Sequence, residues 1–121
     1  MKHTHYQDVP LEDVNVEGAR KVKVRWLISE EDGADNFFMR RFEIEPGGNT
    51  PRHEHDWEHE VYILQGHGSV LTEGSRERFG PGDVIYFEAA EEHAFYADRG
   101  EPVAFLCLIP TEGSAGGCAV R

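Results

Sequence analysis

The chain has 121 residues, with 12 Lys and Arg against 23 Asp and Glu, and its formal net charge at pH 7 is -11. This length fits one compact domain that buries a core without disulfide bonds. The acidic balance argues against nucleic acid and anionic membranes as partners, because both attract positive charge. The N-terminus lacks the apolar core of a secretion signal, and the two cysteines form no disulfide framework. We therefore expect a cytoplasmic protein.

Short apolar runs separated by Gly, Pro and Asp recur along the sequence, and no segment shows a helical stripe. This pattern is typical of an all-β fold. The predicted strands, in chain order, are Val22–Ser29, Asn36–Glu45, Val61–Leu64, Gly68–Thr72, Arg76–Phe79, Asp83–Phe87, Ala94–Ala97 and Val103–Pro110. An N-terminal arm is expected over residues 1–15, the β-domain over residues 16–111 and a flexible C-terminal tail over residues 112–121.

Two predicted strands are apolar on both faces. In Val103–Pro110 and in Val61–Leu64, consecutive residues are apolar, although neighbours on a strand point to opposite sides. One apolar face of each strand packs in the interior of the domain. The other apolar face must be shielded from water by another part of the protein or by a second subunit. We expect a homodimer to provide it; a crossing segment of the same chain is the alternative.

Histidines cluster after the second predicted strand. His53, His55 and His59 lie within seven residues, and His93 precedes a later strand. Residues two apart on a strand share a side, so His53 and His55 project together, while His59 shares parity with Val61 and can face the interior. Imidazole is a common nitrogen ligand for transition metals. These four histidines are the predicted metal ligands; exposed decoration of an acidic loop is the alternative.

Two stretches around these histidines resemble the motifs of the cupin family. They read Gly47-x5-His53-x-His55-x3-His59-x6-Gly66 and Gly82-x5-Glu88-x-Ala90-x2-His93-x3-Ala97. The chain is most similar to small single-domain manganese cupins, which share a Trp-Glu-His-Glu stretch and a Phe-Leu-Cys-Leu-Ile-Pro strand. The resemblance implies a double-stranded β-helix (a jelly-roll barrel) over residues 16–111, with one divalent metal in its mouth. It favours Mn, then Fe, while an all-imidazole site also suits Zn, Ni or Cu.

The chain departs from these motifs in both halves. His59 stands where the first motif places a glutamate ligand, which leaves four neutral imidazoles and, at a six-coordinate metal, two open positions. Glu60 is next to it, but its opposite parity makes it a weaker candidate, an acceptor for an imidazole N–H. The usual Pro, Gly and Asn of the second motif are replaced by Glu88, Ala90 and Ala97.

Strand parity and the resemblance together suggest the wall of a substrate pocket. The candidate residues are Arg40, Trp57, Val61, Phe95, Phe105, Cys107 and Ile109. Ordinary core packing is the alternative for each aromatic side chain, and an inert buried thiol is the alternative for Cys107. Arg40 interrupts an apolar strand face, so its charge requires either an inward carboxylate or an anionic or carbonyl-bearing substrate.

The leading functional hypothesis is a metal-dependent, dioxygenase-like oxidoreductase that acts on a small, partly apolar organic molecule. An aromatic wall with few polar groups suits oxidation better than sugar binding. One alternative is an isomerase or lyase that uses the metal as a Lewis acid on a substrate carbonyl. Such an enzyme also needs a proton acceptor within reach of the substrate. The other is a metal-bearing binding protein without catalysis. No Ser-His-Asp pattern or glycine-rich phosphate loop is present in the sequence.

Overall fold

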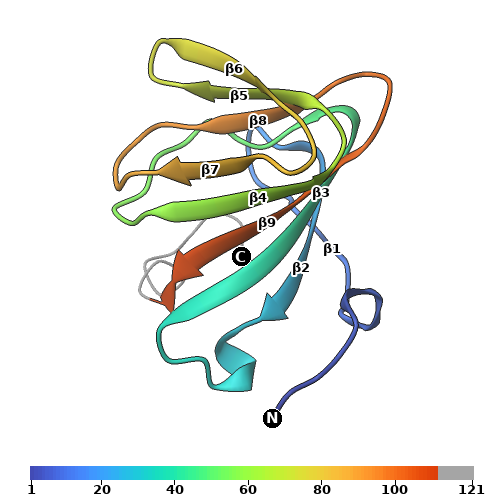
Figure 1. Ribbon diagram of the computed structural model, residues 1–121, viewed down its shortest axis with the longest axis vertical. Helices are drawn as coiled ribbons and strands as arrows, with labels where there is room; N and C mark the ends of the chain where they lie inside the picture. Colours follow the sequence, from blue (N-terminus) through green and yellow to red (C-terminus); the bar gives the residue numbers. More distant parts are fainter. Residues whose placement is uncertain (112–121) are drawn as a thin grey trace.

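The computed structural model describes residues 1–111 and consists almost entirely of β-strands (Figure 1). The predicted C-terminal tail, residues 112–121, lies outside the described residues. The elements in chain order are the 3-10 helix η1 (Tyr6–Asp8), β1 (Glu12–Asp13), β2 (Arg20–Ile28), η2 (Glu30–Asp32), β3 (Phe37–Asn49), β4 (His59–Gln65), β5 (Gly68–Thr72), β6 (Ser75–Phe79), β7 (Val84–Phe87), β8 (Ala94–Ala97) and β9 (Val103–Pro110).

The strands form one curled antiparallel sheet. Its main path runs in the order β6-β5-β8-β3-β9-β4-β7, while β2 also pairs with β3, and β1 with β2. Apart from the β5–β6 hairpin, neighbours on this path are not consecutive in sequence. The sheet folds over and encloses an interior (Figure 1). The all-β prediction and its barrel architecture are confirmed. No described segment forms a helix long and apolar enough to cross a bilayer.

Strand β3 extends farther than predicted. The sequence suggests a turn at Pro46-Gly47-Gly48, yet the strand continues to Asn49, which pairs with both Arg20 and Tyr96. Two glycines explain this. Gly47 has φ of 78°, and a Cβ on Gly48 would lie 2.5 Å from the carbonyl oxygen of Arg20. The glycines therefore let the strand bend and pack closely against β2, where a larger residue would clash.

The segment predicted as an N-terminal arm packs on the sheet. Glu12 and Asp13 pair with Val24 and Lys23 of β2. Val14, which follows them, is only 8% exposed and belongs to the apolar core. A short extra strand thus brings one valine of the arm into the barrel.

The outer face of the sheet keeps large apolar side chains exposed. Tyr62 and Leu64 of β4 are 47% and 38% exposed, and Val84 and Tyr86 of β7 are 74% and 55% exposed. Leu106 of the adjacent β9 is half-buried. No crossing segment within residues 1–111 buries Tyr62 and Leu64 on this face of β4, so among the described residues that alternative fails for β4. On the corresponding face of β9, Ala104 is buried. The homodimer stays a prediction.

Candidate metal centre

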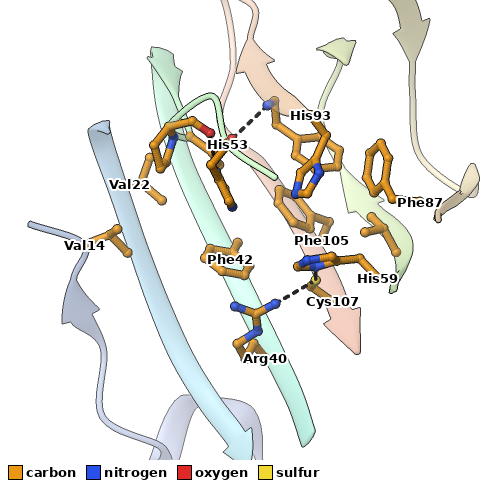
Figure 2. Close-up of a pocket in the computed structure, with 14 residues that line it drawn as sticks. Val14, Val22, Arg40, Phe42, His53, His59, Phe87, His93, Phe105 and Cys107 are labelled. Carbon is orange, nitrogen blue, oxygen red and sulfur yellow. Dashed lines mark hydrogen bonds between the residues drawn. The ribbon is translucent and has the colours of Figure 1, made fainter. Parts of the chain in front are cut away.

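The histidines meet because two loops are tied together at the mouth of the barrel. His53 and His93 form an isolated antiparallel bridge in which each backbone N–H donates to the other residue's carbonyl, with N···O distances of 3.2 and 3.0 Å. His93 lies directly before β8, and His59 is the first residue of β4. Figure 2 shows the rings of His53, His59 and His93 converging on one pocket.

Three of the predicted ligands form a compact group. Ligand nitrogens of His53, His55 and His93 all lie within 4.8 Å of one another. His59 lies beside this group, with its ring centroid 4.7 Å from that of His93 and 5.2 Å from that of His55. The structure therefore brings the four rings together, with His59 outside the tightest set.

Hydrogen bonds orient two of these rings. Nδ1 of His53 lies 2.7 Å from the carbonyl oxygen of Pro51, and Nδ1 of His93 lies 2.9 Å from that of Glu91. A carbonyl oxygen only accepts, so Nδ1 carries the proton in both rings. Each Nε2 consequently keeps a free lone pair, which is the form that binds a metal ion.

His59 shows a mismatch that a metal would resolve. Its Nδ1 lies 3.4 Å from Sγ of Cys107, while its buried Nε2 has no hydrogen-bond partner among the described residues. A buried, unsatisfied polar atom costs about 1–3 kcal/mol. A metal ion is a fitting partner for it, because imidazole nitrogen suits first-row transition metals. The four-nitrogen donor set therefore fits the metal that the cupin motifs imply.

The cluster favours neutral imidazoles. Burial lowers the pKa of His59 to about 2, that of His55 to about 3 and that of His93 to about 4. Burial also lowers the pKa of His53. The positive charge of Arg40 adds to the effect at all four rings. At neutral pH the rings are therefore in the neutral form, with one nitrogen of each ring free of a proton, as metal binding requires.

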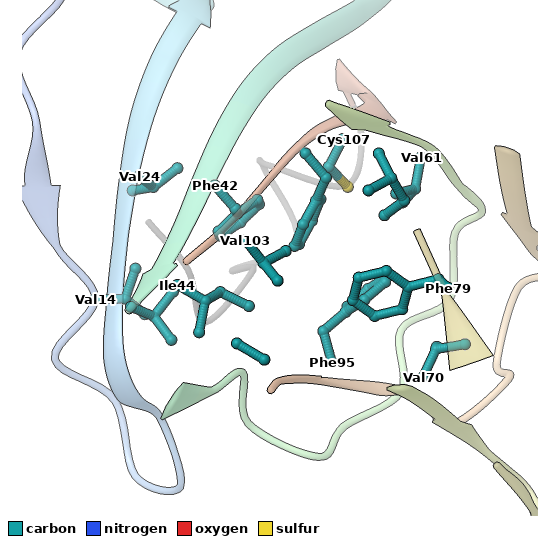
Figure 3. Close-up of a cluster of buried hydrophobic side chains, with 14 of the residues drawn as sticks. Val14, Val24, Phe42, Ile44, Val61, Val70, Phe79, Phe95, Val103 and Cys107 are labelled. Carbon is teal, nitrogen blue, oxygen red and sulfur yellow. The ribbon is translucent and has the colours of Figure 1, made fainter. Parts of the chain in front are cut away.

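A small cavity of about 30 Å³ lies next to the histidines (Figure 2). Besides three of the histidines, five of the seven residues predicted for the pocket wall line it: Arg40, Val61, Phe95, Phe105 and Cys107. Several residues of the apolar core, which Figure 3 shows, also line this cavity. Among them, the Phe105 ring is stacked between Phe42 and Phe95 at centroid distances of 5.3 and 4.5 Å. This volume holds about two water molecules.

Two predicted wall residues do not line the cavity. Trp57 lies flat against the ring of His55, with a centroid distance of 4.5 Å and an interplanar angle of 4°. It covers a candidate ligand instead of the cavity. Ile109 is 2% exposed and packs in the core. It shares the inward face of β9, but it lies too far along the strand to reach the cavity.

The prediction for Glu60 is wrong. Its side chain is exposed on the outer face of the sheet, where Glu60 pairs in register with Tyr86 and Leu108. The opposite parity that made it a weaker candidate places the whole thickness of the sheet between its carboxylate and the imidazoles.

Sequence reasoning missed six lining residues: Val14, Val22, Phe42, Thr50, Pro51 and Phe87. Phe42 shares the face of Arg40 on β3, so parity could have identified it. Phe87 could not be found this way, because its stacking on His93 at 4.4 Å joins two segments across the β7–β8 loop.

Arg40 is buried in the cavity wall, with 1% of its surface exposed. Its Nη2 donates a hydrogen bond to Sγ of Cys107 at 3.0 Å, and its guanidinium carbon lies 4.9 Å from the centroid of Phe42. No carboxylate side chain lines the cavity in the part of the chain that the structure describes. The cavity thus combines a permanent positive charge with apolar walls.

Comparisons with known proteins give related folds with several activities. The polyketide cyclase RemF from Streptomyces resistomycificus is 40% identical, with 92% of this chain and 80% of that chain covered and a TM-score of 0.87. A curated 1-methylthio-D-xylulose 5-phosphate methylsulfurylase from Rhodospirillum rubrum is 31% identical over 74 residues, or 61% of this chain and 47% of that protein. L-ectoine synthase from Bordetella petrii is 29% identical over 87 residues, or 70% of this chain and 64% of that protein.

The chain therefore spans about half to two thirds of the length of these two curated relatives. A family model described as "Cupin domain" matches residues 40–109, which include both histidine motifs and all the strands from β4 to β8. The match covers more than half of the chain and agrees with the barrel fold and the paired loops at its mouth. The chain belongs to the cupin family.

Proposed function

We propose that this chain is a metal-dependent enzyme of the isomerase or lyase type that closes a ring within a substrate carrying several carbonyl groups. The observation that carries the proposal is the group of neutral histidines beside a cavity whose wall holds the cation of Arg40. Similarity to a protein described as a polyketide cyclase adds support, since a polyketide carries carbonyls along its chain. The relatives reported above give no support to the dioxygenase-like hypothesis, which this proposal replaces.

In this proposal His53, His55, His59 and His93 hold one divalent metal ion. A metal ion held there would supply Lewis acidity toward a substrate carbonyl. The family resemblance favours Mn, then Fe, and the nitrogen donors also suit Zn, Ni or Cu.

Other cavity residues surround the substrate in this proposal. Ring closure also needs a proton acceptor; no carboxylate lines the cavity in the described part of the chain, so solvent at the mouth takes the proton from the attacking carbon. The guanidinium of Arg40 carries several N–H donors, so it can stabilise negative charge that develops on a substrate oxygen. The rings of Phe42 and Phe105 keep water away and strengthen this interaction. Because the cavity is only about 30 Å³, a carbonyl group enters it while the rest of the substrate stays at the mouth.

The first experiment measures metal content in protein purified without a nickel column. The second incubates loaded protein with heptane-2,4,6-trione, a linear 1,3,5-triketone that yields 5-methylresorcinol when the ring closes with loss of water. We expect faster formation of the resorcinol by the loaded protein than by metal-free protein or His93→Ala. Glu60→Gln is the matched control, because this carboxylate lies on the outer face.

Three results would contradict the proposal. Protein that binds none of the five metals has no metal centre. Oxygen uptake with alkenyl or phenolic compounds, without ring closure of the triketone, would identify the protein as an oxygenase. Metal binding with neither ring closure nor oxygen uptake would identify a binding protein.

A further inference from the structure

A cysteine sulfur connects a buried cation with a candidate metal ligand. Sγ of Cys107 lies 3.0 Å from Nη2 of Arg40 and 3.4 Å from Nδ1 of His59 (Figure 2). All three residues are at most 4% exposed. The contact joins strands β3, β9 and β4 inside the barrel.

His59 differs from two other candidate ligands in how its ring is held. His53 and His93 are oriented by carbonyl oxygens of the backbone, at Pro51 and Glu91, which no substitution removes. The Nδ1 of His59 instead faces a side chain, the thiol of Cys107. The orientation of the His59 ring can therefore be changed by mutation.

We propose that Cys107 is a positioning residue for the metal centre: its sulfur accepts the Nδ1–H of His59 and so directs Nε2 to the metal. Arg40 holds the sulfur in place by donating a hydrogen bond to it from the neighbouring strand β3. The inference rests on the proposed metal centre. It gives a role to the buried, unpartnered Nε2 of His59, which then faces the ion.

Strand pairing fixes the sulfur. Cys107 lies on β9, between β3 and β4, and its backbone pairs in register with Arg40 on one side and with Val61 on the other. His59 is two residues before Val61 and on the same face of β4. The sulfur is thus held at a fixed position between the guanidinium and the imidazole.

The first test needs no metal. Nitrogen-15 NMR of the metal-free wild-type protein at pH 7.5 identifies the protonated ring nitrogen of each histidine. We expect His59 to carry its proton on Nδ1, as His53 and His93 do. Protonation of His59 on Nε2 would overturn the inference, because Cys107 would then not accept from Nδ1.

The second test uses Co²⁺ as the probe, with affinity measured by chelator competition and geometry by visible absorption. Loss of a group that orients a ligand typically weakens metal affinity 10–100-fold. We expect a loss of about this size and a changed spectrum for Cys107→Ala, and recovery to within about threefold for Cys107→Ser, which restores an acceptor. Ile109→Ala is the matched control, because Ile109 is buried on the same face of β9 and outside the cavity.

The outcomes separate the two proposals. Equal affinity and an identical spectrum in Cys107→Ala would refute the role of Cys107 and leave the metal centre standing. If the wild type binds no Co²⁺ or other divalent metal, the proposed function fails first. If Cys107→Ala does not fold, the NMR result and the comparison of Cys107→Ser with the wild type decide.

Discussion

Acidification should destabilise the metal-free protein, because its buried histidines resist protonation. His59 and His93 are each 4% exposed, and burial lowers their pKa values to about 2 and about 4 from the ordinary 6.5. Below pH 6.5 the unfolded chain therefore binds more protons than the folded chain. The contribution of these histidines to the free energy of unfolding is fully present above pH 6.5. It decreases as the pH falls from there toward the pKa values of the folded state.

The size of the loss follows from these pKa values. At pH 5.5, protonation of an imidazole with a pKa of 6.5 stabilises the unfolded state by about 1.4 kcal/mol. The folded state gains almost nothing from His93, because the pKa of that ring is about 4. His59 and His93 together then lower the free energy of unfolding by about 3 kcal/mol. This is a sizeable part of the roughly 5–15 kcal/mol that is typical for the unfolding of a domain. His53 and His55, whose pKa values are also lowered, act in the same direction.

Urea denaturation in the presence of a chelator measures this loss. The free energy of unfolding at pH 7.5 and at pH 5.5 should differ by at least about 3 kcal/mol in the wild type, and by about 1.4 kcal/mol less in His93→Gln, which has one titrating ring fewer. A stability that stays constant or rises on acidification would refute the reasoning, since it would mean that the rings are protonated or solvated in the folded state.

Three further results are expected. His93→Ala should lose its metal in elemental analysis, while Glu60→Gln keeps the wild-type content because Glu60 lies on the outer face. Phe87→Ala should lower the free energy of unfolding in urea by about 3–5 kcal/mol, since this ring is 1% exposed and stacks on His93. Analytical ultracentrifugation should show a dimer that Tyr62→Glu or Val84→Glu converts to a monomer, as both side chains are exposed on the apolar outer face; a monomeric wild type would contradict this.

Local patterns in the sequence identify most of the fold. The predicted bounds of β5, β8 and β9 agree with the structure, because each is a short apolar run between turn residues. Parity also sends Glu60 of β4 to the outer face, away from the imidazoles. His53 and His55 do lie together as expected, although neither belongs to a named strand. The strand bounds depend on local turn residues, and the placement of Glu60 depends on the two-residue period of a strand.

Features that depend on distant pairing were not predictable in this way. Val14 lines the cavity because Glu12 and Asp13 pair with β2, a contact that no apolar run indicates. Trp57 was predicted to face the cavity, but it stacks on His55 because the chain between His55 and His59 is a loop without strand parity. The role of Cys107 likewise required the positions of three separate strands.

The mutual backbone bridge of His53 and His93 has a consequence for how the barrel tolerates change in length. The backbones of His53 and His93 hold each other through two hydrogen bonds. An insertion in the loop of either residue would therefore move both imidazoles together, or it would move one imidazole and break both hydrogen bonds. The β5–β6 hairpin at Glu73-Gly74 carries no such tie. The space beside Gly74 is open, although its φ of 72° favours glycine at that position itself. Extra residues, fusion tags or reporter peptides therefore belong at that hairpin, away from the coupled loops.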